Sequence, residues 1–224
     1  MSSVDRARIL SKVSVDQLFD VFTTLDFKDR NIYGNYLAQT YYYVHQVTRV
    51  LSFAAGKCDI KTQLNLHERL LNSLKEESNH DLLAKNDLEY LGFNLEMFPE
   101  QMETRNFFES IFYTIETYGP NALLGYFFPQ EGLASNKLTP LYQQLKDLYG
   151  EEATTFLKEH CILDVKHYHN ALKLLDLCTE EELKAIEIGI RRSTELYKSI
   201  LLAIPQMTKN FKSIIEPMSY VQTI

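Results

Sequence analysis

Long stretches of the chain place apolar residues every three or four positions, which is the period of an amphipathic α-helix. The clearest stretch runs from Ile60 to Leu91, and Gly92 after it is a typical stop signal. Its apolar side is set by Leu64, Leu70, Leu71, Leu74, Leu82, Leu83, Leu88 and Leu91. No stretch shows a convincing period-two alternation of the kind that β-strands have. The pattern therefore predicts an all-α protein.

About seven helices are predicted. Ser14 is expected to cap the first of them. The expected segments are residues 15–25, 29–55, 60–91, 100–118, 121–149, 151–177 and a last helix that starts after Thr179 with Glu182 in a capping box. No linker, repeat or low-complexity tract divides the sequence. We therefore expect residues 1–224 to form one helical domain.

Prolines are expected to kink or interrupt two of these helices, because a proline inside a helix removes a backbone hydrogen bond and clashes with the previous turn. Pro129 and Pro140 lie within the fifth segment, so we expect a kink near Glu131 or separate pieces there. Pro205 is expected to end or bend the last helix, and the tail to Ile224 is weakly patterned.

Composition narrows the class of protein. With 45% hydrophobic residues the chain can build a sizeable core, while a net charge of −7 and scattered basic residues argue against nucleic acid and anionic membrane as partners. No apolar run is long enough to span a bilayer, and the first ten residues hold no apolar signal core. The three cysteines, Cys58, Cys161 and Cys178, form no CxxC pair. These features predict a cytoplasmic protein with reduced thiols.

One stripe of the 151–177 segment carries metal-ligating residue types. In a helix, His160, Asp164 and His167 lie at roughly 0°, +40° and −20° around the axis, and therefore on one side. Two imidazoles and a carboxylate on a partly buried stripe are costly unless they are paired. A divalent transition metal suits this mixture of nitrogen and oxygen donors.

Two further polar positions extend the candidate site. Glu77 and His80 have the Glu-x-x-His spacing with which di-iron bundles supply two ligands from one helix, although the same spacing also occurs on solvated helix faces. Glu76 shares a face with His80 as well, so the choice between the two glutamates stays open, with Glu77 preferred. Glu131 follows an apolar, aromatic run. Three carboxylates and three imidazoles would suit two iron ions, or manganese.

These motifs resemble a known family. The order of Glu-x-x-His, a glutamate–glycine pair after an aromatic run, and His-x-x-x-Asp-x-x-His is similar to the haem-oxygenase-like di-iron oxidases, and closest to the CADD-like proteins (the chlamydial protein associating with death domains and its bacterial relatives). The aromatic stretch 42–45 and the segments 131–150 and 156–174 also fit, and the likeness covers about residues 26–177. The Glu–His spacing is shorter here than in the chlamydial protein.

The resemblance implies a seven-helix bundle without haem, in which two irons activate O₂ and oxidise a small organic substrate. The implied ligands are Glu77, His80, Glu131, His160, Asp164 and His167, and the metal-binding core spans about residues 26–177. An apolar substrate pocket would be lined by Tyr43, Phe108, Phe112, Tyr118, Phe127 and Phe128. A homodimer is a possible assembly. The resemblance does not specify the substrate or the reductant.

The sequence bears on three other functions. A haem oxygenase needs an axial histidine in its first helix, which this chain lacks, and a TenA-like thiaminase needs a nucleophilic cysteine in its pocket, whereas Cys161 points about 100° away from His160. A CADD-like helical interaction module without catalysis is the main alternative, and metal content distinguishes it from an oxidase.

Overall fold

The computed structural model describes the backbone of residues 1–219 and the side chains of residues 1–209. Over these residues the protein is built from helices, with no strand, as the sequence pattern predicts. The α-helices are α1 (Ser3–Phe22), α2 (Arg30–Val44), α3 (Val47–Lys57), α4 (Leu64–Glu76), α5 (His80–Tyr90), α6 (Met102–Tyr118), α7 (Ala122–Lys137), α8 (Thr139–Tyr149), α9 (Thr155–Leu174) and α10 (Glu180–Ser219). Two short 3-10 helices, Leu95–Met97 and Leu175–Leu177, complete the set.

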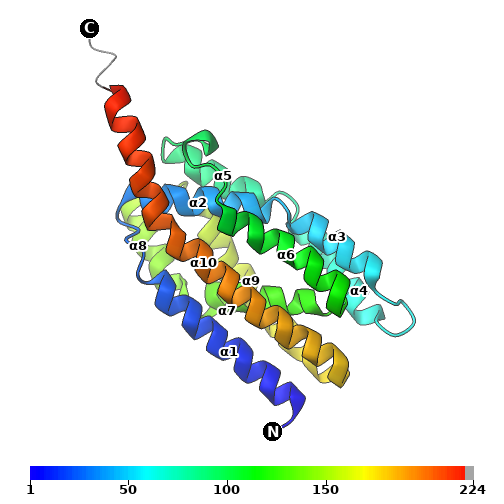
Figure 1. The fold of residues 1–224 in the computed structure, drawn as a ribbon. Helices are drawn as coiled ribbons and strands as arrows, with labels where there is room; N and C mark the ends of the chain where they lie inside the picture. Colours follow the sequence, from blue (N-terminus) through cyan, green and yellow to red (C-terminus); the bar gives the residue numbers. More distant parts are fainter. Residues whose placement is uncertain (220–224) are drawn as a thin grey trace.

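The long helix α10 is central to the packing of the bundle. It packs against α7, α1, α6 and α2, and Figure 1 shows it crossing the whole molecule with α1 beside it. The two helices run in the same direction, since Ser3 contacts Glu180 and Arg6 pairs with Glu187 near their N-terminal ends. Helix α9 packs on α7 from the other side, so α7 lies between α9 and α10. One continuous hydrophobic cluster contains residues from most of these helices.

Three predicted helices are each divided in two. The predicted helix 29–55 breaks at His45 and Gln46, so the prediction of one helix there is wrong. The prediction of a single helix 60–91 is also wrong, because Asn79 has a left-handed backbone (φ 69°) that an α-helix cannot contain. Residues 121–149 divide at Leu138, just before Pro140, whereas α7 continues through Pro129 past Glu131.

The helix ends also differ from expectation in places. The first helix begins at Ser3 rather than near Ser14, because Ser2 and Asp5 form a reciprocal capping box and Ser14 is buried inside the helix. The Thr179–Glu182 capping box of α10 is confirmed. Helix α10 does not end at Pro205. Residues 220–224 of the predicted tail lie outside the described residues.

Helix α9 begins later than predicted, after a turn that starts at Gly150. Its first turn is held by Asp87 of α5, whose carboxylate accepts hydrogen bonds from the backbone N–H groups of Thr155 (3.1 Å) and Phe156 (2.9 Å). This contact ties α9 to α5. The stripe on α9 is thereby brought beside the junction between α4 and α5.

Candidate metal centre

A compact group of ligand types lies where α5 meets α9. Ligand atoms of Glu77, His80 and His160 all lie within 4.8 Å of one another. Glu77 is the capping residue directly after the last residue of α4 and His80 is the first residue of α5, so the break at Asn79 lies between them. The Glu-x-x-His spacing therefore brings the two side chains together across the junction of two helices, and not along one helix as expected.

The three residues pack closely. His80 Nδ1 is 3.0 Å from Glu77 Oε2, but the two are poorly aligned for a hydrogen bond, and His80 Nδ1 has no such partner. The rings of His80 and His160 meet edge to face with centroids 5.3 Å apart. On its other edge, His160 Nδ1 lies 2.9 Å from the carbonyl oxygen of Phe156. Because a carbonyl only accepts, Nδ1 carries the hydrogen and Nε2 is free to act as a ligand.

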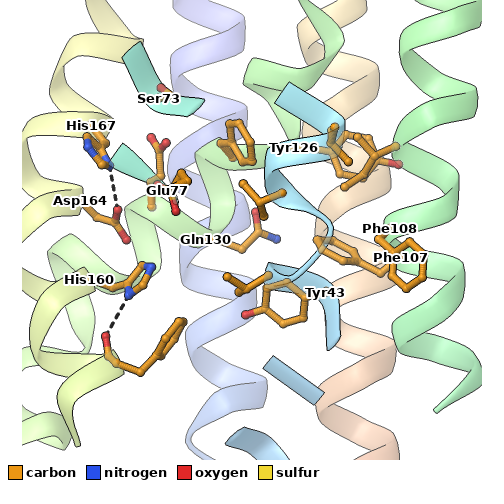
Figure 2. Close-up of a pocket in the computed structure, with 17 residues that line it drawn as sticks. Tyr43, Ser73, Glu77, Phe107, Phe108, Tyr126, Gln130, His160, Asp164 and His167 are labelled. Carbon is orange, nitrogen blue, oxygen red and sulfur yellow. Dashed lines mark hydrogen bonds and ion pairs between the residues drawn. The ribbon is translucent and has the colours of Figure 1, made fainter. Parts of the chain in front are cut away.

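The other two residues of the α9 stripe, Asp164 and His167, line the same cavity as Glu77 and His160. Asp164 and His167 are almost buried, with side chains 7% and 11% exposed, and Asp164 Oδ1 is 3.2 Å from His167 Nδ1. Figure 2 shows Asp164 and His160 on the same side of the cavity as His167. Contact with Asp164 raises the pKa of His167 to about 9, whereas burial raises the pKa of the Asp164 carboxyl. The stripe predicted from helical spacing is confirmed as a geometric feature.

Glu131 reaches the same cavity from α7. Its side chain is only 14% exposed, its Oε2 has no hydrogen-bond partner, and burial raises its pKa to about 7. Its Oε1 is 3.8 Å from Arg69, which also donates to the backbone oxygen of His167 at 3.4 Å. Arg69 is a half-buried cation at the site that no sequence signal singled out, because it is one of many polar residues on α4.

A cavity of about 100 Å³ adjoins these residues. Of the six aromatic residues expected in a pocket, Tyr43, Phe108 and Phe127 line it. Its other aromatic and apolar walls, which the sequence did not single out, are Phe107, Tyr126, Phe156, Ile111, Val44, Val47 and Val50. Glu77, Glu131, His160, Asp164 and His167 line its polar end, so the ligand types and the apolar wall share one space (Figure 2).

The other three expected pocket residues lie elsewhere. Phe112 packs on Phe53, Tyr118 is 39% exposed beneath Arg192, and Phe128 is buried against Tyr168. Phe112 and Phe128 each directly follow a residue that does line the cavity, Ile111 and Phe127 respectively. Which member of a run faces a cavity depends on how the helices are rotated, and a run of consecutive aromatics carries no periodic signal for that.

Two polar residues of the cavity were also missed. Gln130 donates to the Ser193 hydroxyl at 2.8 Å, and Ser193 donates in turn to the carbonyl oxygen of Tyr126, also at 2.8 Å. Ser73 of α4 completes the polar lining. Glu76 does not line the cavity, but it contacts His167 at 3.1 Å.

The donor set fits iron. Imidazole nitrogens and carboxylate oxygens are ligands that ferrous iron accepts, and Glu131 Oε2 is a buried polar atom without a hydrogen-bond partner, whose burial is costly unless a further partner binds it. No helix among the described residues is both long and apolar enough to cross a membrane. The three cysteines are all unpaired, and burial raises the pKa of the Cys161 thiol to about 11, which makes it a poor nucleophile.

Comparisons with known proteins agree with this description. Residues 34–198 match a family model described as iron-containing redox enzyme. Among solved structures, the chain is similar to a domain of unknown function with a haem-oxygenase-like fold from Shewanella denitrificans OS217, with a TM-score of 0.79 and 19% identity over 90% of this chain and 93% of that one. No curated protein matches significantly. The nearer likeness to CADD-like proteins stays a prediction. The chain belongs to the haem-oxygenase-like family of iron-containing redox enzymes.

Proposed function

We propose that the protein is a non-haem di-iron oxidase or oxygenase that uses O₂ to oxidise a small organic substrate in the apolar cavity. The observation that carries the proposal is the convergence of five titratable side chains from three parts of the chain on one end of that cavity, with His80 packed beside Glu77 and His160. Burying such groups costs several kcal/mol each, in order-of-magnitude terms, unless ions or hydrogen bonds compensate. A helical interaction module has no need of this cluster.

Two sets of residues would hold the ions. Glu77, His80 and His160 form the set that is already assembled, and Asp164, His167 and Glu131 would form the second. Ferrous ions bound there would supply redox chemistry towards O₂ that the side chains of the protein lack.

Residues around the ion sites would form the wall of the cavity and set its charge. Phe107, Phe127 and Phe156 give the cavity an apolar wall that excludes water and packs against a hydrocarbon or aromatic group of the substrate. Gln130 is held by Ser193, so its amide has a defined orientation at the cavity wall. Arg69 places positive charge beside Glu131 and offsets part of the cost of burying that carboxylate.

The proposal is tested by iron content and by the response to O₂. The protein, reconstituted anaerobically with Fe²⁺, is expected to hold about two ions per chain and to change its visible absorption when O₂ is admitted. Asp164→Ala and His160→Ala are expected to lose at least one ion while keeping most of their helicity.

Cys161→Ser is the matched control, since Cys161 lies on α9 between these residues and its thiol is not in the cluster. Its iron content should equal that of the unmodified protein. A folded protein that binds no iron, or an Asp164→Ala variant with unchanged iron content, would contradict the proposal and favour an interaction module.

A further inference from the structure

His167 is held between two carboxylates, one at each ring nitrogen. Asp164 Oδ1 is 3.2 Å from Nδ1, and Glu76 Oε2 is 3.1 Å from Nε2. A neutral imidazole has one nitrogen that carries hydrogen and one with a free lone pair, and only the latter can bind a metal. The outer partner of the ring therefore decides which nitrogen faces an ion.

The two carboxylates differ in where they lie. Asp164 lines the cavity and its side chain is 7% exposed. Glu76 does not line the cavity, and its side chain is 43% exposed. The Nδ1 edge of His167 is therefore paired with a cavity residue, while the Nε2 edge is paired with a residue outside the cavity. Lys166 Nζ, 4.0 Å from Glu76 Oε1, places positive charge near the second oxygen of Glu76.

His160 shows the same arrangement with the nitrogens exchanged. Its Nδ1 donates to the backbone oxygen of Phe156, which leaves Nε2 for the cluster. Metal-bound histidines in proteins commonly donate their other N–H to a carboxylate or a carbonyl, which holds the ring and sets its tautomer. Both candidate ligand histidines of α9, His160 and His167, have such a partner already in place.

We propose that Glu76 is a positioning residue that accepts the Nε2 hydrogen of His167 and leaves Nδ1 to bind the ion shared with Asp164. This rests on the proposed di-iron function. Two adjacent glutamates at the end of α4 then have different tasks, since Glu77 contributes its carboxylate to the cluster and Glu76 orients a ligand from outside. The choice between them that the sequence left open is thereby a division of roles.

The tautomer can be read directly. In protein labelled with ¹⁵N-histidine and loaded with Zn²⁺, which is diamagnetic and accepts the same donors, long-range ¹H–¹⁵N spectra should show Nε2 of His167 protonated and Nδ1 metal-bound. A metal-bound Nε2 in the unmodified protein would overturn the proposal, because Glu76 would then have been displaced or be a ligand itself.

Affinity provides the second measurement. Glu76→Ala is expected to weaken Zn²⁺ binding by about 10- to 100-fold, with partial rescue in Glu76→Gln, whose amide oxygen still accepts the hydrogen bond. Glu68→Ala, an exposed position on the same helix, should bind as the unmodified protein does.

The outcomes separate the two proposals. If the unmodified protein binds two ions and Glu76→Ala binds both with unchanged affinity, the role of Glu76 is wrong and the di-iron function stands. If the unmodified protein binds none, both are wrong. Because the Glu76 side chain is 43% exposed and lies outside the core, the variants are expected to fold, and circular dichroism checks this.

Discussion

At the scale of single residues, the cost of burying charge governs the candidate centre. Glu131 and Asp164 have raised pKa values because burial disfavours their ionised forms, while His167 and His80 have raised pKa values because carboxylates stand beside them. In the metal-free protein the raised pKa values of both kinds of group favour protonation, which lowers the cost of burying the carboxylates. Bound cations would relieve it without protons.

This gives the metal-free protein a defined pH dependence. The pKa of His167 is about 9 when folded, against an ordinary value of 6.5, so its contribution to the free energy of unfolding is complete below pH 6.5 and is lost as pH rises towards 9. Glu131, with a pKa raised to about 7, acts in the same direction at lower pH. Urea unfolding at pH 7, 8 and 9 should therefore show falling stability.

His167 is expected to contribute most of this slope, which should become shallower in His167→Asn, while His80, whose pKa is also raised, acts in the same direction. His169→Asn, which changes an exposed histidine two residues along the same helix, should keep it. An equal fall with pH in the two variants would show that other groups cause it.

At the scale of elements, the junction between α4 and α5 positions the site. A continuous helix over this segment would carry Glu77 and His80 on its face, and the left-handed Asn79 instead turns the chain between them. Asparagine tolerates this backbone better than residues with a branched or apolar side chain. A single residue with an unusual backbone thus sets how two ligand types from neighbouring helices approach His160.

Two substitutions at Asn79 separate backbone conformation from side-chain chemistry. Asn79→Ala should lower the free energy of unfolding by about 1 kcal/mol and weaken Fe²⁺ binding, because alanine resists the left-handed conformation. Asn79→Gly should retain both properties, since glycine adopts it readily. The measurements are urea unfolding and anaerobic Fe²⁺ titration, and equal losses in both variants would mean that the side chain itself matters.

At the scale of the whole molecule, close packing of α7 on α10 holds one wall of the site in place. Gly125 and Gly189 face each other across this contact, where a Cβ on Gly189 would lie 2.2 Å from the backbone oxygen of Ala122. No side chain fits there without separating the helices. Since α7 also carries Glu131, the spacing of these two helices bears on where that carboxylate lies.

Gly189→Ala is therefore expected to lower the free energy of unfolding by about 3 kcal/mol or more, because the obstacle is rigid backbone. It should also reduce iron loading, as α7 moves with Glu131. Gly56→Ala is the control: nothing lies within 4 Å of its Cβ position, and alanine in a helix should be neutral or stabilising by about 0.5–1 kcal/mol. Thermal unfolding of both variants distinguishes them, and similar midpoints would contradict the packing argument.

The candidate site was predictable where its residues belong to one helix. His160, Asp164 and His167 share a face because helical geometry is local, and the structure confirms that face. The aromatic residues were harder, since Phe127 and Phe128 are adjacent and only the first lines the cavity. Arg69 was not predictable, because its pairing with Glu131 joins α4 to α7 and leaves no mark in either segment.

The amino-acid pattern alone determined the helical class, most helix ends that have glycine or capping residues, and the chemistry of the ligand types. These properties depend on residues that are only a few positions apart in the sequence, so they can be recognised without knowing how the helices pack. Only the tertiary structure decided the break at Asn79, the approach of Glu131 to the α9 stripe and the separate surroundings of Glu76 and Glu77. Those depend on how helices rotate and pack, which is settled by the summed burial of the whole core and not by any one segment.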